Sequence, residues 1–199
     1  MKVNYQNKLM TIINSLQTRP HILLHSCCGP CSTTVLTFLV TYFDITVFYY
    51  NSNIEPRAEY EKRKQEQIRF IQEFNNEHIT FLDCDYANQD FRSKVKGLEQ
   101  EKEGGARCAV CFKLRLEKTA RLAKKLNFDY FGTTLTVSPH KNSQIINEIG
   151  ALLETEYGVK YLYSDFKKKD GYKKSIELSK QYHLYRQDYC GCLFGRVVS

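Results

Sequence analysis

The sequence contains little proline and glycine, and it has no apolar run long enough for a membrane span. Its 4 Pro and 10 Gly exclude a collagen-like or low-complexity chain. The longest stretch without a charged residue, residues 20–43, is interrupted by Gly29-Pro30, two His and three Cys, so no helix there can cross a bilayer. The N-terminus lacks an apolar signal core and a small-residue cleavage site. We therefore expect a cytoplasmic protein with no membrane partner.

The remaining composition is that of an ordinary globular protein, with 42% hydrophobic and 26% charged residues. A chain of 199 residues can bury roughly 70% of the surface that it exposes when unfolded. The formal charge of +7 is unevenly distributed, because residues 104–199 carry 17 Lys and Arg against 9 Asp and Glu. A basic half is compatible with a polyanionic partner such as nucleic acid and equally with a solvated surface.

Short apolar runs alternate with amphipathic helical patterns along the chain. Such alternation is typical of a parallel sheet that is covered by helices on both faces. Each half of the chain has too few strands for a covered sheet of its own, so we expect one α/β domain over residues 1–199. The predicted strands are residues 22–24, 45–50, 78–82, 129–134 and 159–163. The predicted helices are residues 9–16, a helix capped by Ser32 or Thr33 and continuing through Tyr42, and residues 56–75, 108–126 and 142–157.

Eight cysteines is a high number for a cytoplasmic chain, and seven of them are grouped. Three stand in His25-Ser26-Cys27-Cys28-Gly29-Pro30-Cys31, where the first predicted strand leads into a helix, and two in Arg107-Cys108-Ala109-Val110-Cys111, at the start of another helix. The loops that follow parallel strands meet at one edge of a sheet, and helix N-termini favour thiolates. Two cysteines from each loop suit a four-thiolate site for zinc or for an iron–sulfur cluster, which spacing does not distinguish.

The separate roles of Cys28, Cys31 and Cys84 leave alternatives open. Cys28-Gly29-Pro30-Cys31 has the spacing of a thioredoxin active site, but the chain is much longer than that fold needs. Cys31, together with His25, is a candidate ligand to a second metal, and packing alone would explain it as well. The lone Cys84 is expected to be a small buried hydrophobe.

Cys190 and Cys192 near the C-terminus are separated by Gly191. In an extended chain, residues at this spacing have Cα atoms near the upper limit of about 6.8 Å for a disulfide, so a bridge needs the bend that glycine permits. A strained bridge is readily reduced, and such a dithiol beside a metal site can deliver two electrons. The alternative is a pair of surface cysteines on a fraying terminus.

Together, these motifs closely resemble the QueH family of epoxyqueuosine reductases. The resemblance extends from about His21 to Cys192. Departures from the family pattern are Ser52, where Pro is usual, Phe91, where Trp is frequent, and the run Glu103-Gly104-Gly105. Besides the cysteine motifs, the resemblance rests on Asn51, Asn53, Ile54, Tyr60 and Arg63, on Thr133-Thr134-Leu135, Ser138-Pro139 and Lys141, on Asp165-Phe166-Lys167-Lys168, Ser175 and Ser179, and on Leu184-Tyr185-Arg186-Gln187-Asp188-Tyr189.

The resemblance implies a fold similar to that of the adenine nucleotide alpha hydrolases, a Rossmann-like α/β sandwich of the HUP type. In that fold the first strand–helix loop often binds ATP, but here the loop carries cysteines. The sequence contains neither GxxxxGK[ST] nor GxGxxG, so we expect no ATP and no nucleotide hydrolysis. The implied activity is the last step of queuosine synthesis, the reduction of epoxyqueuosine to queuosine at the wobble position of tRNAs with GUN anticodons. It is an oxidoreductase activity independent of cobalamin.

By resemblance, Cys27, Cys28, Cys108 and Cys111 ligate a [4Fe-4S] cluster, and Cys190 and Cys192 form a redox-active disulfide. The family implies an additional mononuclear iron near the cluster, for which Cys31 is an open candidate ligand. The electron donor is a partner that the sequence does not identify.

Removing an epoxide oxygen from a tRNA nucleoside also requires proton donors and residues that bind the RNA. Asp165 and His25 are candidate proton donors, although an Asp after a strand often caps a helix and a His beside cysteines often packs. For tRNA binding, Arg107, Arg186, Lys167 and Lys168 are predicted to contact phosphates, and Tyr185 and Tyr189 to stack on the wobble base. Two rival classes stay open: a zinc-stabilised RNA-binding module, and a thiol-disulfide oxidoreductase that uses only Cys28 and Cys31.

Overall fold

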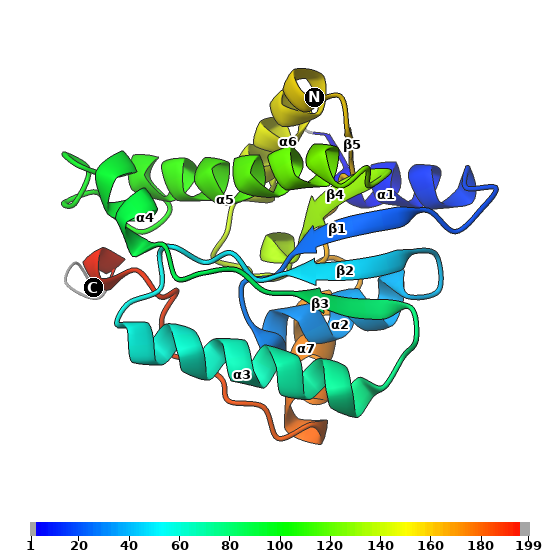
Figure 1. Cartoon of the computed structure of the whole chain (residues 1–199), viewed down its shortest axis with the longest axis horizontal. Coiled ribbons are helices and arrows are strands. Elements are labelled where there is room, and N and C mark those ends of the chain that lie inside the picture. The colour runs from blue at the N-terminus through cyan, green and yellow to red at the C-terminus, as the bar shows by residue number, and fades with distance from the viewer. Residues whose placement is uncertain (1–2, 196–199) are drawn as a thin grey trace.

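A five-stranded sheet lies between two layers of helices in the computed structural model, which describes residues 3–195 (Figure 1). The sheet order is β3-β2-β1-β4-β5, and all neighbouring strands are parallel. The predicted α/β fold with a helix-covered parallel sheet is confirmed. The strands are β1 (His21–His25), β2 (Asp44–Phe48), β3 (Ile79–Leu82), β4 (Tyr130–Thr133) and β5 (Lys160–Tyr161); the helices are α1 (Tyr5–Asn14), α2 (Gly29–Leu39), α3 (Arg57–Phe74), α4 (Asn88–Lys94), α5 (Ala106–Lys125), α6 (Ser143–Tyr157) and α7 (Gly171–Gln181).

Successive side chains of the central strand β1 enter two different cores. Ile22 and Leu24 pack in the layer that holds α1, α2 and α7, whereas Leu23 packs with Phe131 against α5 and α6. Figure 1 shows α5 and α6 on one side of the sheet and α2, α3 and α7 on the other. Full burial of a Leu side chain contributes about 1.5–3 kcal/mol. A strand that is buried on both faces therefore reads as the continuous apolar run that predicted it.

The chain order reverses between β1 and β4. The chain passes from β1 outward to β2 and β3 and then returns to place β4 on the other side of β1. The loops that follow β1 and β4 therefore run in opposite directions. In open α/β sheets, ligands bind in the crevice that such loops leave at the carboxyl ends of the strands, the topological switch point. The loop after β1 carries Cys27 and Cys28, so the fold places these thiols at that point.

Helix α2 begins four or five residues earlier than predicted. The capping residue is Cys28 rather than Ser32 or Thr33, and the helix ends at Leu39 rather than Tyr42. Pro30 stands in the first turn, where its missing N–H costs nothing. The hydroxyls of Ser32 and Thr33 donate to the carbonyls of Gly29 (2.8 Å) and Pro30 (2.9 Å) inside the helix. The early start places Cys31 on the first helical turn.

Helices α4 and α7 were not predicted, because their inward residues are few or small. The inward side of α7 carries Ser175 and Ser179, whose hydroxyls donate to backbone carbonyls of the same helix. Helix α7 packs mainly against α2. After α7, residues 182–195, hereafter the C-terminal segment, run along α3 toward α4 (Figure 1). Among the helices of residues 3–195, none combines the length and hydrophobicity needed to cross a membrane.

Candidate functional site

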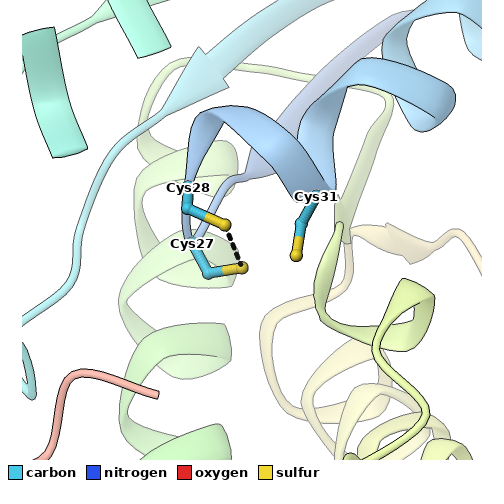
Figure 2. A group of neighbouring side chains, drawn as sticks. All are labelled: Cys27, Cys28 and Cys31. Atoms are coloured by element: carbon cyan, nitrogen blue, oxygen red, sulfur yellow. Dashed lines mark hydrogen bonds between the residues drawn. The ribbon is translucent and has the colours of Figure 1, made fainter. Parts of the chain in front are cut away.

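Three cysteine sulfurs form a close group at the carboxyl end of β1. The Sγ atoms of Cys27, Cys28 and Cys31 all lie within 4.8 Å of one another, and those of Cys27 and Cys28 are 3.8 Å apart. Figure 2 shows the Cys31 sulfur on the first turn of α2, facing the other two across a small gap. Cys27 and Cys28 are buried, and Cys31 is partly exposed. The group offers three soft ligand atoms of the kind that bind zinc or iron.

Of the three thiols in this group, Cys27 is the one whose pKa is lowered. The thiols of Cys28 and Cys31 hydrogen-bond to the Cys27 sulfur and hold the pKa of Cys27 well below its usual value. The same bonds raise the pKa of Cys28 to about 11 and that of Cys31 well above its usual range, because a second thiolate beside the first is repelled. A bound cation would remove this repulsion and allow all three sulfurs to ionise.

A second set of thiols lines a small cavity of about 40 Å³. Cys108 and Cys111 stand in the first turns of α5, and Cys190 and Cys192 of the C-terminal segment complete the lining. The backbone N–H of Gly104 donates to the Cys108 sulfur at 3.2 Å. Burial raises the pKa of Cys111 to about 12. Cys108 and Cys111 are therefore beside Cys190 and Cys192, and they do not belong to the group of three within 4.8 Å.

Cys190 connects the two thiol sets. It lines this small cavity and also a larger, open cavity of about 420 Å³ whose wall contains Cys31 and Lys141. Cys190 and Cys192 are free thiols in this structure, as are the other six cysteines. Gly191 between them has a φ of +118°, the left-handed region where glycine is favoured. The predicted bend at Gly191 is confirmed, whereas the predicted disulfide stays a prediction.

Two cations face the thiols. Arg115 is 1% exposed, and its Nε donates to the Cys111 carbonyl at 3.2 Å, while its Nη2 has no hydrogen-bond partner among residues 3–195. Lys141 lines the open cavity. Burial opposes its charge, but attraction to Cys190, Cys27 and Cys31 prevails and raises the pKa of Lys141 above its usual value. Neither cation forms an ion pair with a carboxylate of the described residues.

Four residues in the linings of the thiol cavities carry a buried polar atom without a hydrogen-bond partner among residues 3–195. A buried donor or acceptor left unsatisfied costs about 1–3 kcal/mol, so a cluster of them indicates a place that a ligand or water fills. The thiols and the two cations, Arg115 and Lys141, make the site suitable for an anionic, sulfur-ligated metal group. Within residues 3–195 the unpartnered atoms are Asn53 Oδ1, Arg107 Nε and Arg115 Nη2 at the smaller cavity and Gln187 Oε1 at the larger one.

Helix α3 holds the C-terminal segment over the site through residues spaced three apart on one face. Arg69 donates to the carbonyls of Tyr182 and His183, both at 3.1 Å. Glu66 accepts from the Tyr185 N–H at 2.7 Å. Arg63, 2% exposed, donates to the carbonyls of Tyr189 (3.3 Å) and Cys190 (3.2 Å).

Contacts with the loop after β2 complete the attachment. The Tyr189 hydroxyl donates to the Glu55 carbonyl at 2.5 Å, and the Glu55 N–H donates to the Gly191 carbonyl at 2.9 Å. The Gln187 amide nitrogen lies 3.0 Å from the Cys28 sulfur, which ties the segment directly to the three-cysteine group. Cys190 is thus positioned by contacts on both sides.

The structure gives the two predicted proton donors internal partners. His25 is fully buried; its Nδ1 lies 3.0 Å from Thr133 Oγ1 and its Nε2 3.0 Å from the Tyr50 carbonyl. Burial lowers the pKa of His25 to about 3, so a neutral ring supports the loop from beneath. Asp165 accepts from Lys167 at 2.6 Å and is absent from the described linings of both thiol cavities.

The predicted RNA-binding residues differ in how accessible they are. Arg186 and Lys168 are exposed, and Arg186 and Tyr189 line the open cavity. Arg107 is 2% exposed, and its Nη1 donates to the carbonyls of Leu98, Glu99 and Glu101. Its contacts are internal, so the predicted phosphate contact does not fit this arrangement. Tyr185 is partly exposed, with the Lys62 ammonium 3.4 Å from its ring centroid.

Sequence patterns assigned no role to Arg115, Arg63 or Gln187. Both arginines stand at inward positions of their helices, Arg115 four residues after Cys111 and Arg63 three after Tyr60. A charged residue on an apolar helix face was the available signal, since such a charge is buried only with a partner. The predicted four-thiolate site stays a prediction, because the structure groups Cys27 and Cys28 with Cys31 and places Cys108 and Cys111 beside Cys190 and Cys192.

Comparison with known proteins agrees with these features. The family described as Epoxyqueuosine reductase QueH matches residues 22–197. A protein of that name from Streptococcus pyogenes serotype M1 is 47% identical over 98% of this chain and 78% of its own length. Its counterpart from Staphylococcus epidermidis is 46% identical over 98% and 86%, and that of Thermotoga maritima 37% identical over 87% and 89%. This chain therefore belongs to the QueH family of epoxyqueuosine reductases.

Proposed function

We propose that this protein reduces epoxyqueuosine to queuosine at the wobble position of tRNAs with GUN anticodons, without cobalamin. The observation that carries the proposal is the position of Cys190. It stands between Cys108 and Cys111 in one cavity and Cys31 in the other, and the second cavity is open and large enough for part of a nucleoside. Family membership supplies the substrate class.

The chemistry of the thiols supports an iron–sulfur cluster at this site. Cys27, Cys28, Cys108 and Cys111 would hold a [4Fe-4S] group, and Cys31 would remain for an additional iron. When bound, this iron–sulfur group supplies one-electron transfer and Lewis acidity. Arg115 would balance its negative charge, since the Nη2 of Arg115 has no partner among the described residues. Without an anion there, an unpaired buried guanidinium would be costly.

The Cys190 and Cys192 thiols would supply the electrons and protons that the reaction consumes. The epoxide oxygen leaves as water, and both of its C–O bonds are replaced by a C=C bond, which takes two electrons and two protons. Oxidation of the two thiols to a disulfide releases two electrons and two protons. A cellular reductant, the unidentified electron-donating partner, then returns the disulfide to the dithiol.

The open cavity provides the groups for substrate placement. Lys141 presents an ammonium beside Cys31 and Cys190, where it would hydrogen-bond the departing oxygen and donate a proton to it. Arg186 and Tyr189 line the same cavity and suit a phosphate and a base respectively. Gln187, through its contact with Cys28, would hold this part of the C-terminal segment against the three-cysteine group.

The test is anaerobic incubation of the cluster-loaded protein with tRNA that carries epoxyqueuosine, followed by digestion and nucleoside mass spectrometry. The wild type should form queuosine over many turnovers when a dithiol or dithionite reductant is present. Cys190→Ser should keep its cluster and lose multiple turnover. Cys84→Ser is the matched control, because the Cys84 thiol donates to the Tyr49 carbonyl at 3.2 Å, outside the thiol cavities. Equal turnover by both variants would remove the dithiol from the reaction.

A further inference from the structure

A third cavity, of about 560 Å³, lies between α2 and α7. Its apolar surface comes from Phe38, Phe166 and Leu178, and the rings of Phe38 and Phe166 meet edge to face with centroids 6.4 Å apart. Lys168, Lys169 and Lys174 stand on its border, with Glu177 as the carboxylate in the described lining. We call this cavity the α2–α7 groove. Neither the thiols nor the attachment of the C-terminal segment uses it.

The groove and the thiol site lie along the same face of α2. Cys31, Thr34 and Phe38 are spaced three and four residues apart and so share a face of the helix. Cys31 lines the open thiol cavity, whereas Thr34, Thr37 and Phe38 line the groove. The rise from Cys31 to Phe38 is about 10 Å. Helix α7 makes the same connection, because Tyr172 lines the thiol cavity and Gly171 and Lys174 the groove.

The charges at the groove favour an anion. Lys168, Lys169 and Lys174 form no ion pair with a carboxylate of residues 3–195, although Asp165 takes the neighbouring Lys167. Lys169 and Asp170 both have positive φ, 50° and 62°, in the turn that presents this lysine cluster. Strained turns of non-glycine residues concentrate where a ligand is bound.

The groove also offers an acceptor for a polar ring edge. Gln6 of α1 lines it, and the buried Gln6 Oε1 has no hydrogen-bond partner among residues 3–195. An aromatic floor, a free amide acceptor and a border of lysines together match a nucleotide, whose base stacks and donates N–H groups and whose phosphate is anionic.

We propose that the α2–α7 groove binds the anticodon-loop nucleotides next to the one that enters the thiol cavity. This inference rests on the proposed function, because a tRNA substrate places neighbouring nucleotides within reach along the α2 face. The groove would account for recognition of the loop around the modified base, and the thiol cavity for recognition of that base itself.

The test compares two triple variants with equal change in charge. Lys168, Lys169 and Lys174 are changed to Gln in one, and Lys124, Lys125 and Lys160, exposed lysines at the amino end of the sheet, in the other. Fluorescence anisotropy measures binding of a GUN anticodon stem-loop RNA over a range of salt concentrations. For a single-stranded ligand the salt slope falls by about 0.7 for each lost phosphate contact. The groove variant should therefore lose about 2 from the slope, and the control much less.

A single substitution tests whether the RNA occupies the groove itself, independently of the lysines. Thr37 is exposed within the groove, so Thr37→Glu adds a negative charge without touching the core, and it should weaken RNA binding at least tenfold. Iron content of both groove variants should match the wild type. Groove variants that bind as the control does would overturn this inference alone. A wild type that binds no stem-loop and reduces no epoxyqueuosine would instead overturn the proposed function.

Discussion

Arg63 controls whether the Cys190–Cys192 pair stays over the thiol site, so replacing it should release the C-terminal segment. Arg63 lies on α3, is 2% exposed, and reaches the segment through two guanidinium hydrogen bonds of 3.2 and 3.3 Å. Its Nε donates to Glu59 at 2.6 Å, and its guanidinium lies 4.8 Å from the Tyr189 ring centroid. Arg63→Met keeps most of the side-chain volume and removes all of these contacts.

The magnitude follows from those contacts. A hydrogen bond from a charged donor contributes about 1.5–3 kcal/mol, and both bonds to the segment are long, so the lower value applies to each. Their loss should favour detachment by about 3 kcal/mol, which is roughly a hundredfold in the ratio of detached to attached molecules. The segment keeps its bonds to Glu66 and Cys28, so it should open transiently rather than unfold.

The Glu55 amide reports this opening directly, because its N–H donates to the Gly191 carbonyl. Native-state hydrogen exchange should show about hundredfold faster exchange at Glu55 in Arg63→Met, with the amide of Leu23 in β1 unchanged. Arg121→Met is the matched control, since Arg121 also pairs with a Glu four residues earlier but is exposed, and such pairs contribute about 0.3–0.5 kcal/mol. Exchange at Glu55 that is the same in all three proteins would refute the assignment of Arg63 as the anchor.

Four other changes test neighbouring parts of the site. Gly191→Ala should weaken attachment of the C-terminal segment, because φ is +118° and an added Cβ would lie 2.8 Å from Ile54 Cγ1. Gly195→Ala is the control, because a Cβ there meets nothing within 4 Å. Equal alkylation rates of Cys190 in the two variants would contradict this prediction. Arg115→Met should reduce the iron bound per chain and make the remaining centre harder to reduce, since a nearby positive charge is lost; an unchanged midpoint potential would remove Arg115 as counter-ion. Lys141→Met should slow queuosine formation without changing iron content, and recovery with Lys141→Arg would indicate a role for its charge rather than proton transfer. Removal of iron by a chelator should lower the thermal midpoint of the wild type, because ligands bound only to the folded protein stabilise it, and this difference should disappear when Cys27 and Cys108 are changed to Ser.

Much of the fold could be predicted because its strands are strongly patterned. The run Ile22-Leu23-Leu24 is apolar on both faces and became the central strand β1. Helix α7 could not be predicted from periodicity, because the residues that it buries are Gly171, Ser175 and Ser179. Ser32 and Thr33 have the residue types of a helix cap, but Pro30 started α2 earlier, and tertiary contacts then buried both hydroxyls.

The candidate site was only half visible in the sequence. Spacing indicated that two cysteines from each of the two loops form one site, because Cys108 and Cys111, three apart near a helix start, share a face. The particular set Cys27, Cys28, Cys108 and Cys111 came from the family resemblance and stays a prediction. Spacing did not reveal that Cys31 completes a close group with the first two, nor that Cys190 lies between both sets. The sequence assigned no role to Arg115 or Arg63 for a physical reason. An arginine that is buried beside sulfur cannot be distinguished in a linear sequence from a solvated arginine on a helix.

The most direct test of the thiol centre is the visible spectrum of anaerobically purified protein, with iron, acid-labile sulfide and zinc measured on the same sample. The account predicts brown protein that contains iron and sulfide and bleaches on reduction, and it predicts loss of both elements when Cys27 and Cys108 are changed to Ser but not when Cys84 is. Colourless protein with stoichiometric zinc and no sulfide, after anaerobic reconstitution has also failed, would contradict it.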